Sequence, residues 1–187
     1  MSVTAPSAVS LPTAGRYQID PTHSSVEFVA RHLVAAKVRG RFTDFSGSIE
    51  VGADPLASTV AVEIDMNSID TGVADRDGHL RSPDFFDVEN NPTATFASTS
   101  VREHDGAYIA AGDLTIAGVT SPVELALSFG GEVTDPWGNS RLVFSADTEL
   151  DREDFGLTWN QALETGGLLV GKTVRIEIEI QAVRSDD

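Results

Sequence analysis

The sequence contains no cysteine, and it has only two tryptophans, two tyrosines and two methionines among its 187 residues. The absence of cysteine excludes disulfides, thiolate catalysis and thiolate metal sites, and it fits any cellular compartment. No apolar run approaches the roughly 20 residues that a membrane-spanning helix needs, so no integral membrane segment is expected.

Basic residues are scarce as well. Lysine and arginine together number 13, against 29 aspartates and glutamates, and the formal net charge is −16. A strongly acidic surface repels the phosphates of nucleic acids and the headgroups of anionic lipids. Nucleic acid is therefore not expected as a partner, and the acidity is typical of a protein that charge keeps in solution.

The N-terminal segment MSVTAPSAVSLPTAG lacks lysine, arginine and an apolar stretch, so it does not have the features of a secretory signal. We expect residues 1–15 to be a flexible tail and the protein to be cytoplasmic. Residues 16–187 are expected to form a single domain, because this length suits one hydrophobic core, with or without a ligand cavity.

Apolar and polar residues alternate along most of the chain. In the last such segment Val174, Ile176, Ile178 and Ile180 share one face, and charged residues separate them. The same period recurs in SVEFVARHL, STVAVEIDMNSID, TATFASTSV, AYIAAGDLTIAG, PVELALSFGG and RLVFSADTEL. Turn signals separate these segments at GADPLAS, HDGA, GVTSP and DPWGNS. The pattern predicts an all-β protein of about eight or nine antiparallel strands, arranged as a sandwich or a closed barrel.

The segment KVRGRFTDFSGSIEV needs two phases of alternation. Val38 and Phe42 share one parity, whereas Phe45 and Ile49 share the other. The change of phase at Thr43–Asp44 predicts a bulge or a bend there.

Several small residues share a face with large apolar ones, and two readings of them stay open. They could taper the core or kink the backbone, or they could leave room for a ligand, since eight-stranded barrels are about the size that holds one small molecule. The small residues are Ala30, Gly40, Gly47, Ala110, Gly112 and Ala146.

Two stretches, residues 72–90 and 151–171, are too long for tight hairpin loops and mix aromatic with charged residues. Such stretches typically form lids or short helices over a binding mouth. In the first, Asp75 or Asp77 is expected to cap a short helix. These acids and Asp84 lie beside arginines, which is more typical of structural pairs than of catalysis, and no catalytic residue is predicted.

The four histidines, His23, His32, His79 and His104, show neither HxH nor HExxH spacing, and no metal site is predicted. His32 has the parity of Phe28 and should face inward near the end of its strand. A buried imidazole needs a polar partner there, and a ligand headgroup is one candidate.

Five motifs together resemble the YceI-like family of lipocalin-like, polyisoprenoid-binding proteins, and the resemblance covers nearly all of residues 16–183. The motifs are YQIDPTHSSVEFVARH, GRFTDFSGSIEV, RDGHLRSPDFFDVENNPTATF, AAGDLTIAGVTSPVEL and REDFG. The resemblance implies an antiparallel lipocalin-like β-barrel of about eight strands, with short helices or loops capping its mouth. It also implies a long apolar pocket that holds a polyisoprenoid lipid or an isoprenoid quinone, no required cofactor and no enzymatic activity. The sequence departs from the family pattern at its N-terminus, because many relatives carry a secretory signal and none is recognised here.

The residues expected to contact the ligand are inward-facing or lie in the two long stretches. They are Phe28, His32, Phe42, Phe45, Ile64, Met66, Leu80, Phe85, Phe86, Phe96, Leu114, Leu127, Phe129, Phe144, Phe155, Trp159, Ile176 and Ile178. A polar rim that meets the headgroup is expected from Arg76, His79, Arg81 and Arg152. For Arg76 and Arg81 the alternative is that they hold local carboxylates, and for His79 the alternative is a place on the outer surface. Leu80, Phe85 and Phe86 are expected to close the barrel as a lid, the alternative being a folded cap without ligand contact.

Three functions compete at this point. The leading one is a binding protein for transport, storage or sensing of an isoprenoid lipid or quinone. The second is an enzyme on a lipophilic substrate that uses His32 or a loop acid, and the third is an interaction module with a filled core. A homodimer is a further expectation, because edge strands and exposed aromatics such as Trp137 favour pairing.

Overall fold

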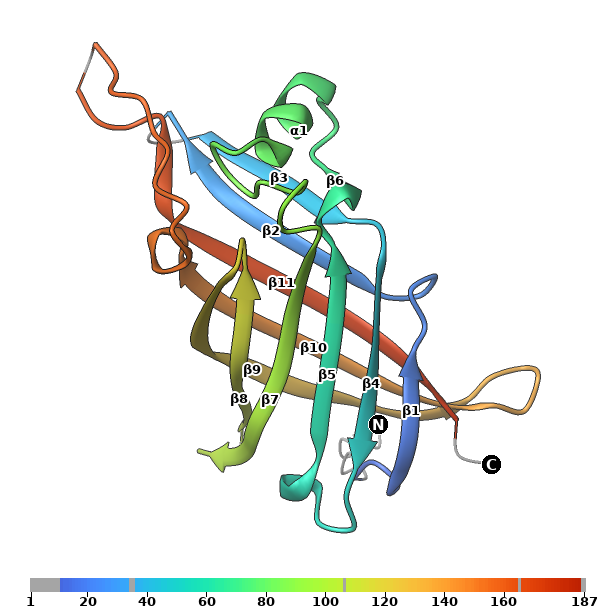
Figure 1. The fold of residues 1–187 in the computed structure, drawn as a ribbon. Coiled ribbons are helices and arrows are strands. Elements are labelled where there is room, and N and C mark those ends of the chain that lie inside the picture. Colours follow the sequence, from blue (N-terminus) through green and yellow to red (C-terminus); the bar gives the residue numbers. More distant parts are fainter. Residues whose placement is uncertain (1–10, 34–35, 106, 165, 186–187) are drawn as a thin grey trace, which may run out of the picture.

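Eight strand positions close into an antiparallel barrel in the computed structural model of the chain, which describes residues 11–33, 36–105, 107–164 and 166–185 (Figure 1). The strands are β1 (Gly15–Ile19), β2 (Ser25–His32), β3 (Ala36–Phe42), β4 (Phe45–Val51), β5 (Thr59–Asp65), β6 (Ile69–Asp70), β7 (Thr93–His104), β8 (Ala107–Ile116), β9 (Val119–Thr134), β10 (Ser140–Asp151) and β11 (Val170–Arg184). The helical elements are the 3-10 turns η1 (Pro55–Ala57), η2 (Met66–Ser68) and η3 (Arg152–Phe155) and the α-helix α1 (Ala74–Arg81).

The barrel closes where the last strand pairs with the first. The hydrogen-bonded order is β1–β4–β5–β7–β8–β9–β10–β11, and β11 returns to β1 with Tyr17 opposite Arg184 and Ile19 opposite Ala182. Full closure removes the open edges that a sandwich would keep. The expected antiparallel barrel of about eight strands is therefore confirmed, and the sandwich alternative is wrong.

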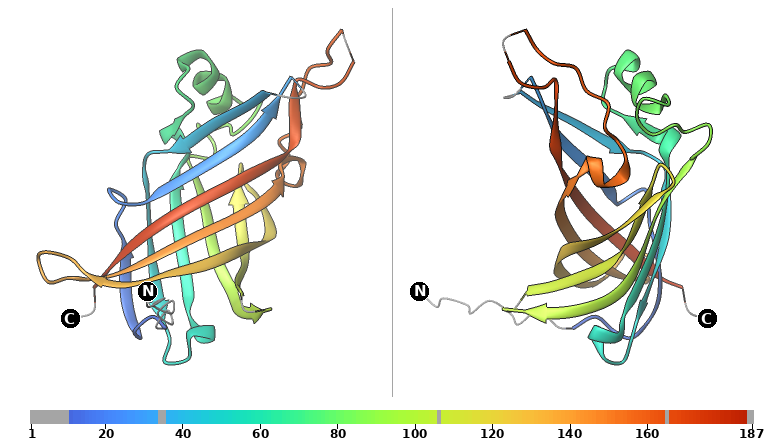
Figure 2. Two further views of the ribbon diagram at one scale, coloured as in Figure 1. Left: turned by 180° about the vertical axis from the view of Figure 1, so that it is seen from behind. Right: turned by 60° about the vertical axis from the view of Figure 1, so that its left-hand side comes forward.

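β2, β3 and β6 lengthen the barrel wall at one end. β11 is long enough to pair with β1 near its C-terminal end and with β2 over Val170–Glu179. β3 pairs with β2, and β6 pairs with the last two residues of β3. The wall is therefore taller on this side, and α1 stands above it (Figures 1 and 2).

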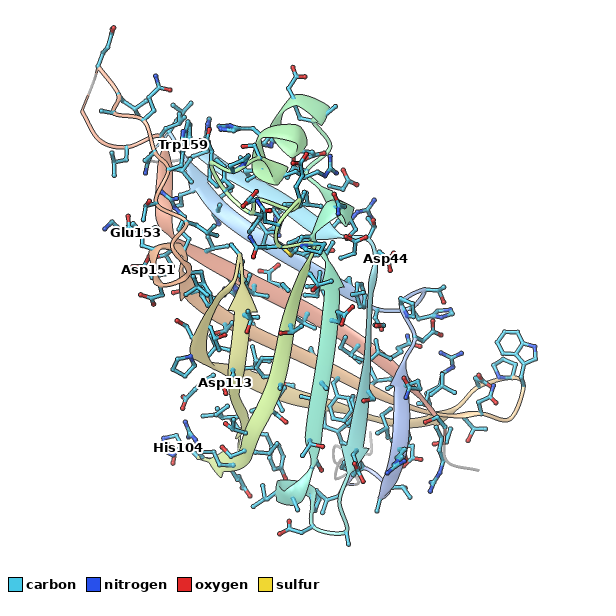
Figure 3. The ribbon with its side chains drawn as sticks, in the orientation of Figure 1. Asp44, His104, Asp113, Asp151, Glu153 and Trp159 are labelled. Atoms are coloured by element: carbon cyan, nitrogen blue, oxygen red, sulfur yellow. The ribbon has the colours of Figure 1, made fainter. Side chains whose placement is uncertain are left out.

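The predicted bend at Thr43–Asp44 is confirmed. β3 ends at Phe42 and β4 begins at Phe45, so the change of phase turns both aromatic side chains inward, where each packs against the cluster around Ile19. The Thr43 N–H donates to the Ser68 carbonyl at 3.2 Å, and the Asp44 carbonyl accepts from the Asp65 N–H at 3.0 Å. The bend is thus held by the neighbouring chain, and Asp44 marks it in Figure 3.

Two of the inward glycines make room for aromatic rings. A Cβ on Gly40 would lie 2.3 Å from the Phe28 ring, and a Cβ on Gly112 would lie 2.6 Å from the Phe96 ring. These two glycines taper the packing. Ala30, which is another of the small inward residues, instead lines a cavity. Both readings of the small residues hold, at different positions.

The turn predicted over GVTSP is shorter than expected. Ala117 and Gly118 have φ values of 50° and 76° and form the turn alone, and β9 already begins at Val119. Pro122 pairs with Asp113 inside the strand. The φ that proline imposes is compatible with some strand positions, so Pro122 could lie inside β9 and did not mark the turn.

Part of the expected tail contacts the barrel. Leu11 and Pro12 lie against the interior, and the Thr13 hydroxyl donates to Glu132 Oε2 at 2.6 Å. Residues 1–10 of the expected tail lie outside the described residues. In the described part of the chain, no helix is long and apolar enough to cross a membrane.

The homodimer stays a prediction. Trp137, at the tip of the β9–β10 hairpin that projects from the barrel, is 80% exposed. Among the described residues, β3 before Arg41 has no partner strand on the side away from β2. Both features are available for pairing.

Candidate ligand-binding site

A cavity of about 330 Å³ fills the barrel and runs from the α1 end to η1 at the opposite end. It is bounded near α1 by Leu80 and Phe85, and near η1 by Val51 and Pro55. Aliphatic and aromatic side chains make up nearly all of its surface. The filled core that the interaction-module hypothesis predicts is therefore not found.

Alternation along the strands places the cavity wall. Ile176, Ile178 and Ile180 of β11 stand opposite Thr148, Ala146 and Phe144 of β10, and all six side chains line the cavity. The charged residues between them face outward, because successive side chains of a strand point to opposite faces. The wall is thus dry on the inside and acidic on the outside.

All but three of the residues expected to contact a ligand line this cavity. The lining residues among them are Phe28, Phe42, Ile64, Met66, Leu80, Phe85, Phe86, Phe96, Leu114, Leu127, Phe129, Phe144, Phe155, Ile176 and Ile178. Their contact with a ligand stays a prediction.

The exceptions are Phe45, His32 and Trp159, which do not line the cavity. Phe45 is only 4% exposed and packs with Ile19 and Val26, which cover it. His32 is half-buried opposite Val170. It lies at the end of β2, as expected, but this position is beyond the cavity. Trp159 lies above the cavity.

Trp159 belongs to an aromatic cluster over the α1 end, which we call the roof cluster and which consists of His79, Phe85 and Trp159. The ring centroids of His79 and Trp159 are 4.6 Å apart, and those of Phe85 and Trp159 are 5.2 Å apart. His79 Nε2 also lies 3.0 Å from Asp84 Oδ2. The cluster joins α1 and the segment after it to the loop after η3, two stretches at the same end of the barrel (Figure 2).

The polar residues of α1 hold the helix to the chain before it. Asp77, which is buried, accepts from the Thr71 N–H at 2.9 Å and from its hydroxyl at 2.5 Å. Arg76 donates to the Thr71 carbonyl at 3.0 Å, and Arg81 donates to the carbonyls of Asn67 and Ile69 at 2.9 and 2.7 Å.

Two expectations for this helix need correction. The residue at the N-cap is Val73, which makes no side-chain cap hydrogen bond, so neither Asp75 nor Asp77 caps the helix. Arg76 and Arg81 were expected at a polar rim, bound to carboxylates or to a headgroup. They instead satisfy backbone carbonyls and do not line the cavity, because the chain from Asn67 to Thr71 runs beside the helix and needs donors.

Arg152 differs from the other rim residues because it does line the cavity. It begins η3, where Asp151 accepts the Glu153 N–H at 2.9 Å and Gly156 ends the turn with a φ of 73°. Its Nε donates to the Gly171 carbonyl at 3.0 Å and its Nη1 to the Leu157 carbonyl. Burial lowers the pKa of the Arg152 guanidinium from its ordinary value.

Some lining residues were missed. Leu11 and Pro12 lie in the expected tail, so no pattern pointed to them. Tyr108 shares the inward parity of its strand and could have been included on that signal. Among the described residues, no group of three or more histidines and carboxylates is placed to hold a metal ion.

Comparisons with known proteins agree with this architecture. A UPF0312 protein of Pseudomonas aeruginosa (strain LESB58) is 43% identical over 147 residues, which cover 77% of each chain. The structure of BcnA from Burkholderia cenocepacia matches with a TM-score of 0.76 at 22% identity, over 87% of this chain and 98% of that one. A polyisoprenoid-binding domain from Saccharophagus degradans matches with a TM-score of 0.68 at 17% identity, over 92% of this chain and all of that one, 100%.

At these identities the two solved structures establish the fold alone. The family assignment comes from the sequence, since the model of the YceI-like domain matches residues 17–182, from the first barrel strand to the last. The closed barrel, its apolar interior and this match agree with one another, and the chain belongs to the YceI-like family.

Proposed function

We propose that the protein binds one isoprenoid lipid or isoprenoid quinone inside its barrel and holds it for transport, storage or sensing. The observation that carries this proposal is the continuous apolar cavity of about 330 Å³. Apolar cavities with few polar groups are the usual sites for lipophilic ligands. The structural neighbour from S. degradans, a polyisoprenoid-binding domain, supports this class of ligand.

The energetics of burial predict how affinity depends on the length of the prenyl chain. Each buried methylene contributes about 0.8 kcal/mol, so a five-carbon unit contributes about 4 kcal/mol at most. Association costs about 4–15 kcal/mol in lost freedom of motion. Chains of one or two units are thus expected to bind weakly, and affinity should rise steeply from C10 to C20.

The roof cluster, with Leu80 and Phe86 beneath it, is proposed as the lid over this ligand. Leu80, Phe85 and Phe86 line the cavity from the segment that α1 begins. Phe86 also packs against Phe42 of the barrel wall, with ring centroids 6.4 Å apart. Opening the lid requires breaking the ring contacts among His79, Phe85 and Trp159.

A binding role is favoured over catalysis. The enzyme hypothesis needs His32 or a loop acid at the cavity, but His32 lies outside the lining. Asp77 is hydrogen-bonded to Thr71, and Asp84 is paired with His79. With no observation in favour of catalysis, we propose neither a catalytic residue nor a required cofactor.

The test is organic extraction of the natively purified full chain, followed by mass spectrometry, with a protein-free mock purification as background. A polyprenyl lipid or quinone in about one-to-one amount is the expected result. The delipidated protein is then titrated with C10, C15 and C20 prenyl alcohols. An empty extract together with no binding of any prenyl chain would overturn the proposal.

A further inference from the structure

Arg152 is the one charged residue in the described lining of the cavity. Its Nη1 donates to the carbonyl of Leu157, which belongs to the same apolar cluster as Phe155 of η3 and Phe86 from the segment after α1, at the roofed end. The residue is only 5% exposed. A positive charge is thus buried against a surface that is otherwise nearly all apolar.

The hydrogen bonds of Arg152 are incomplete. Nε and Nη1 donate to the carbonyls of Gly171 and Leu157, but the buried Nη2 has no hydrogen-bond partner in the described part of the chain. Within the described residues, no carboxylate bonds to the guanidinium either. Burial lowers the pKa of Arg152, but an arginine keeps its charge in proteins. Buried charges are ordinarily paired, and buried donors ordinarily bonded.

The neighbouring carboxylates are occupied elsewhere. Asp151 accepts the Glu153 N–H, and Glu153 pairs with Lys172 at 2.6 Å. Both acids lie at the outer edge of the η3 turn (Figure 3), and the Glu153 carboxylate raises the pKa of Lys172. The charges of Asp151 and Glu153 partly offset the effect of burial on Arg152, but neither carboxylate forms a hydrogen bond or an ion pair with its guanidinium among the described contacts.

The other cations of the expected rim do not compete for this role. Arg76 and Arg81 have backbone carbonyls as partners and lie outside the lining. His79 is paired with Asp84 in the roof cluster. Arg152 alone combines a place in the described lining with an unbonded donor.

We infer that Arg152 binds an anionic oxygen, a carboxylate or a phosphate, at the head of the isoprenoid ligand. The head then lies inside the barrel beneath the roof cluster, and the tail extends toward η1. This inference rests on the proposed function, because it assigns one end of the proposed ligand. A charge-assisted bond to Nη2 completes the guanidinium and balances its charge.

The experiment compares ligands of one chain length on the delipidated full chain. Geranylgeranoic acid, geranylgeranyl phosphate, geranylgeraniol and the matching C20 hydrocarbon each displace a fluorescent prenyl probe, which gives their dissociation constants. The acid, the phosphate or both should bind at least about tenfold tighter than the alcohol, the change expected for a charge-assisted hydrogen bond. The preferred anion distinguishes a carboxylate head from a phosphate head.

Two variants assign the preference to Arg152. Arg152→Gln should remove the preference for the anions over the alcohol, whereas Lys172→Gln, which removes an exposed cation from the same end, should keep it. If Arg152→Gln does not fold, the ligand comparison on the unmodified protein decides alone.

Three results would overturn the inference in distinguishable ways. Equal affinity for the alcohol and both anions would contradict the head-binding role of Arg152, and so would a preference that survives in Arg152→Gln. Neither result would contradict the proposed function. No binding of any C20 compound would contradict both the role of Arg152 and the proposed function.

Discussion

The imidazole of His79 and the indole of Trp159 meet edge to face, with ring planes at 87° and centroids 4.6 Å apart. This contact joins α1 to the loop after η3 and closes the roof. An aromatic pair of this kind contributes about 0.5–1.5 kcal/mol. Trp159→Ala should therefore release a bound fluorescent prenyl probe about three- to tenfold faster in stopped-flow measurements. Trp137→Ala, which removes the exposed hairpin tryptophan, is the control, and equal rates in the two variants would contradict the role of the roof cluster.

Phe85 and Phe86 are both expected to retain the ligand, and Phe86 is also expected to stabilise the fold. Replacing both by serine removes apolar surface at the roofed end of the cavity and should shorten lipid retention, measured as the fraction of prenyl probe kept after gel filtration. Phe86→Ser should also lower the free energy of unfolding by about 2 kcal/mol, because Phe86 packs on Phe42. Leu56→Ser, at an exposed position within η1, should change neither quantity. Unchanged retention in the double variant would leave α1 as a structural cap.

Asp77 should matter for the stability of the α1 end. It is buried and accepts two hydrogen bonds from Thr71. Asp77→Ala leaves the partly buried Thr71 donors without their acceptor, so the free energy of unfolding should fall by about 2 kcal/mol in urea titrations. Asp75→Ala, on the exposed side of the same helix, should change it by less than about 0.5 kcal/mol. Equal effects would show that the Thr71 hydrogen bonds contribute nothing measurable.

Gly112 should tolerate no side chain, because a Cβ there would lie 2.5 Å from the Ala97 carbonyl oxygen as well as against Phe96. A backbone atom cannot move aside as a flexible side chain can. Gly112→Ala is therefore expected to lower the melting temperature, at a cost of about 1–3 kcal/mol. Gly78→Ala in α1 meets nothing within 4 Å and should stabilise the helix by up to about 1 kcal/mol. Opposite signs in the two variants are the expected calorimetric result.

Asp20 should make the fold sensitive to acid. It accepts hydrogen bonds from the Thr22 hydroxyl and from Arg141 Nη1 at 2.6 and 2.7 Å, which hold its pKa well below the ordinary value of 3.8. Because the folded state binds this proton less readily than the unfolded chain, the stabilisation is complete above the ordinary pKa and declines as pH falls below it. Unfolding in urea at pH 7 and pH 3 should show a smaller difference in Asp20→Asn than in the unmodified protein.

The acid dependence should not vanish in that variant. Hydrogen bonds led by that from Asn139 also lower the pKa of Asp135, so part of the slope remains. Asp113→Asn, on the exposed outer face of β8 (Figure 3), is the control. An equal slope in Asp20→Asn and Asp113→Asn would argue against the contribution of Asp20.

The sequence by itself determined the strands, the bend and most of the cavity wall. Alternation of apolar and polar residues has the period of a strand, so Ile176 and Ile178 had to share a face with each other and not with Glu177. The change of phase at Thr43–Asp44 was visible for the same reason. Family motifs then selected the barrel over the sandwich.

Tertiary structure alone decided the rest. The pairing of β1 with β11 depends on the two ends of the chain meeting, and no local pattern encodes that meeting. The stretches that contain Arg81 and Arg152 follow no period of two, so these arginines were equivalent in the sequence, although only Arg152 lines the cavity. The contact between His79 and Trp159 likewise exists only because closure of the barrel brings α1 and the distant loop after η3 to the same end. Alternation with a period of two depends only on the geometry of neighbouring residues in a strand. The direction of a side chain outside the strands depends on the groups that the folded chain places beside it.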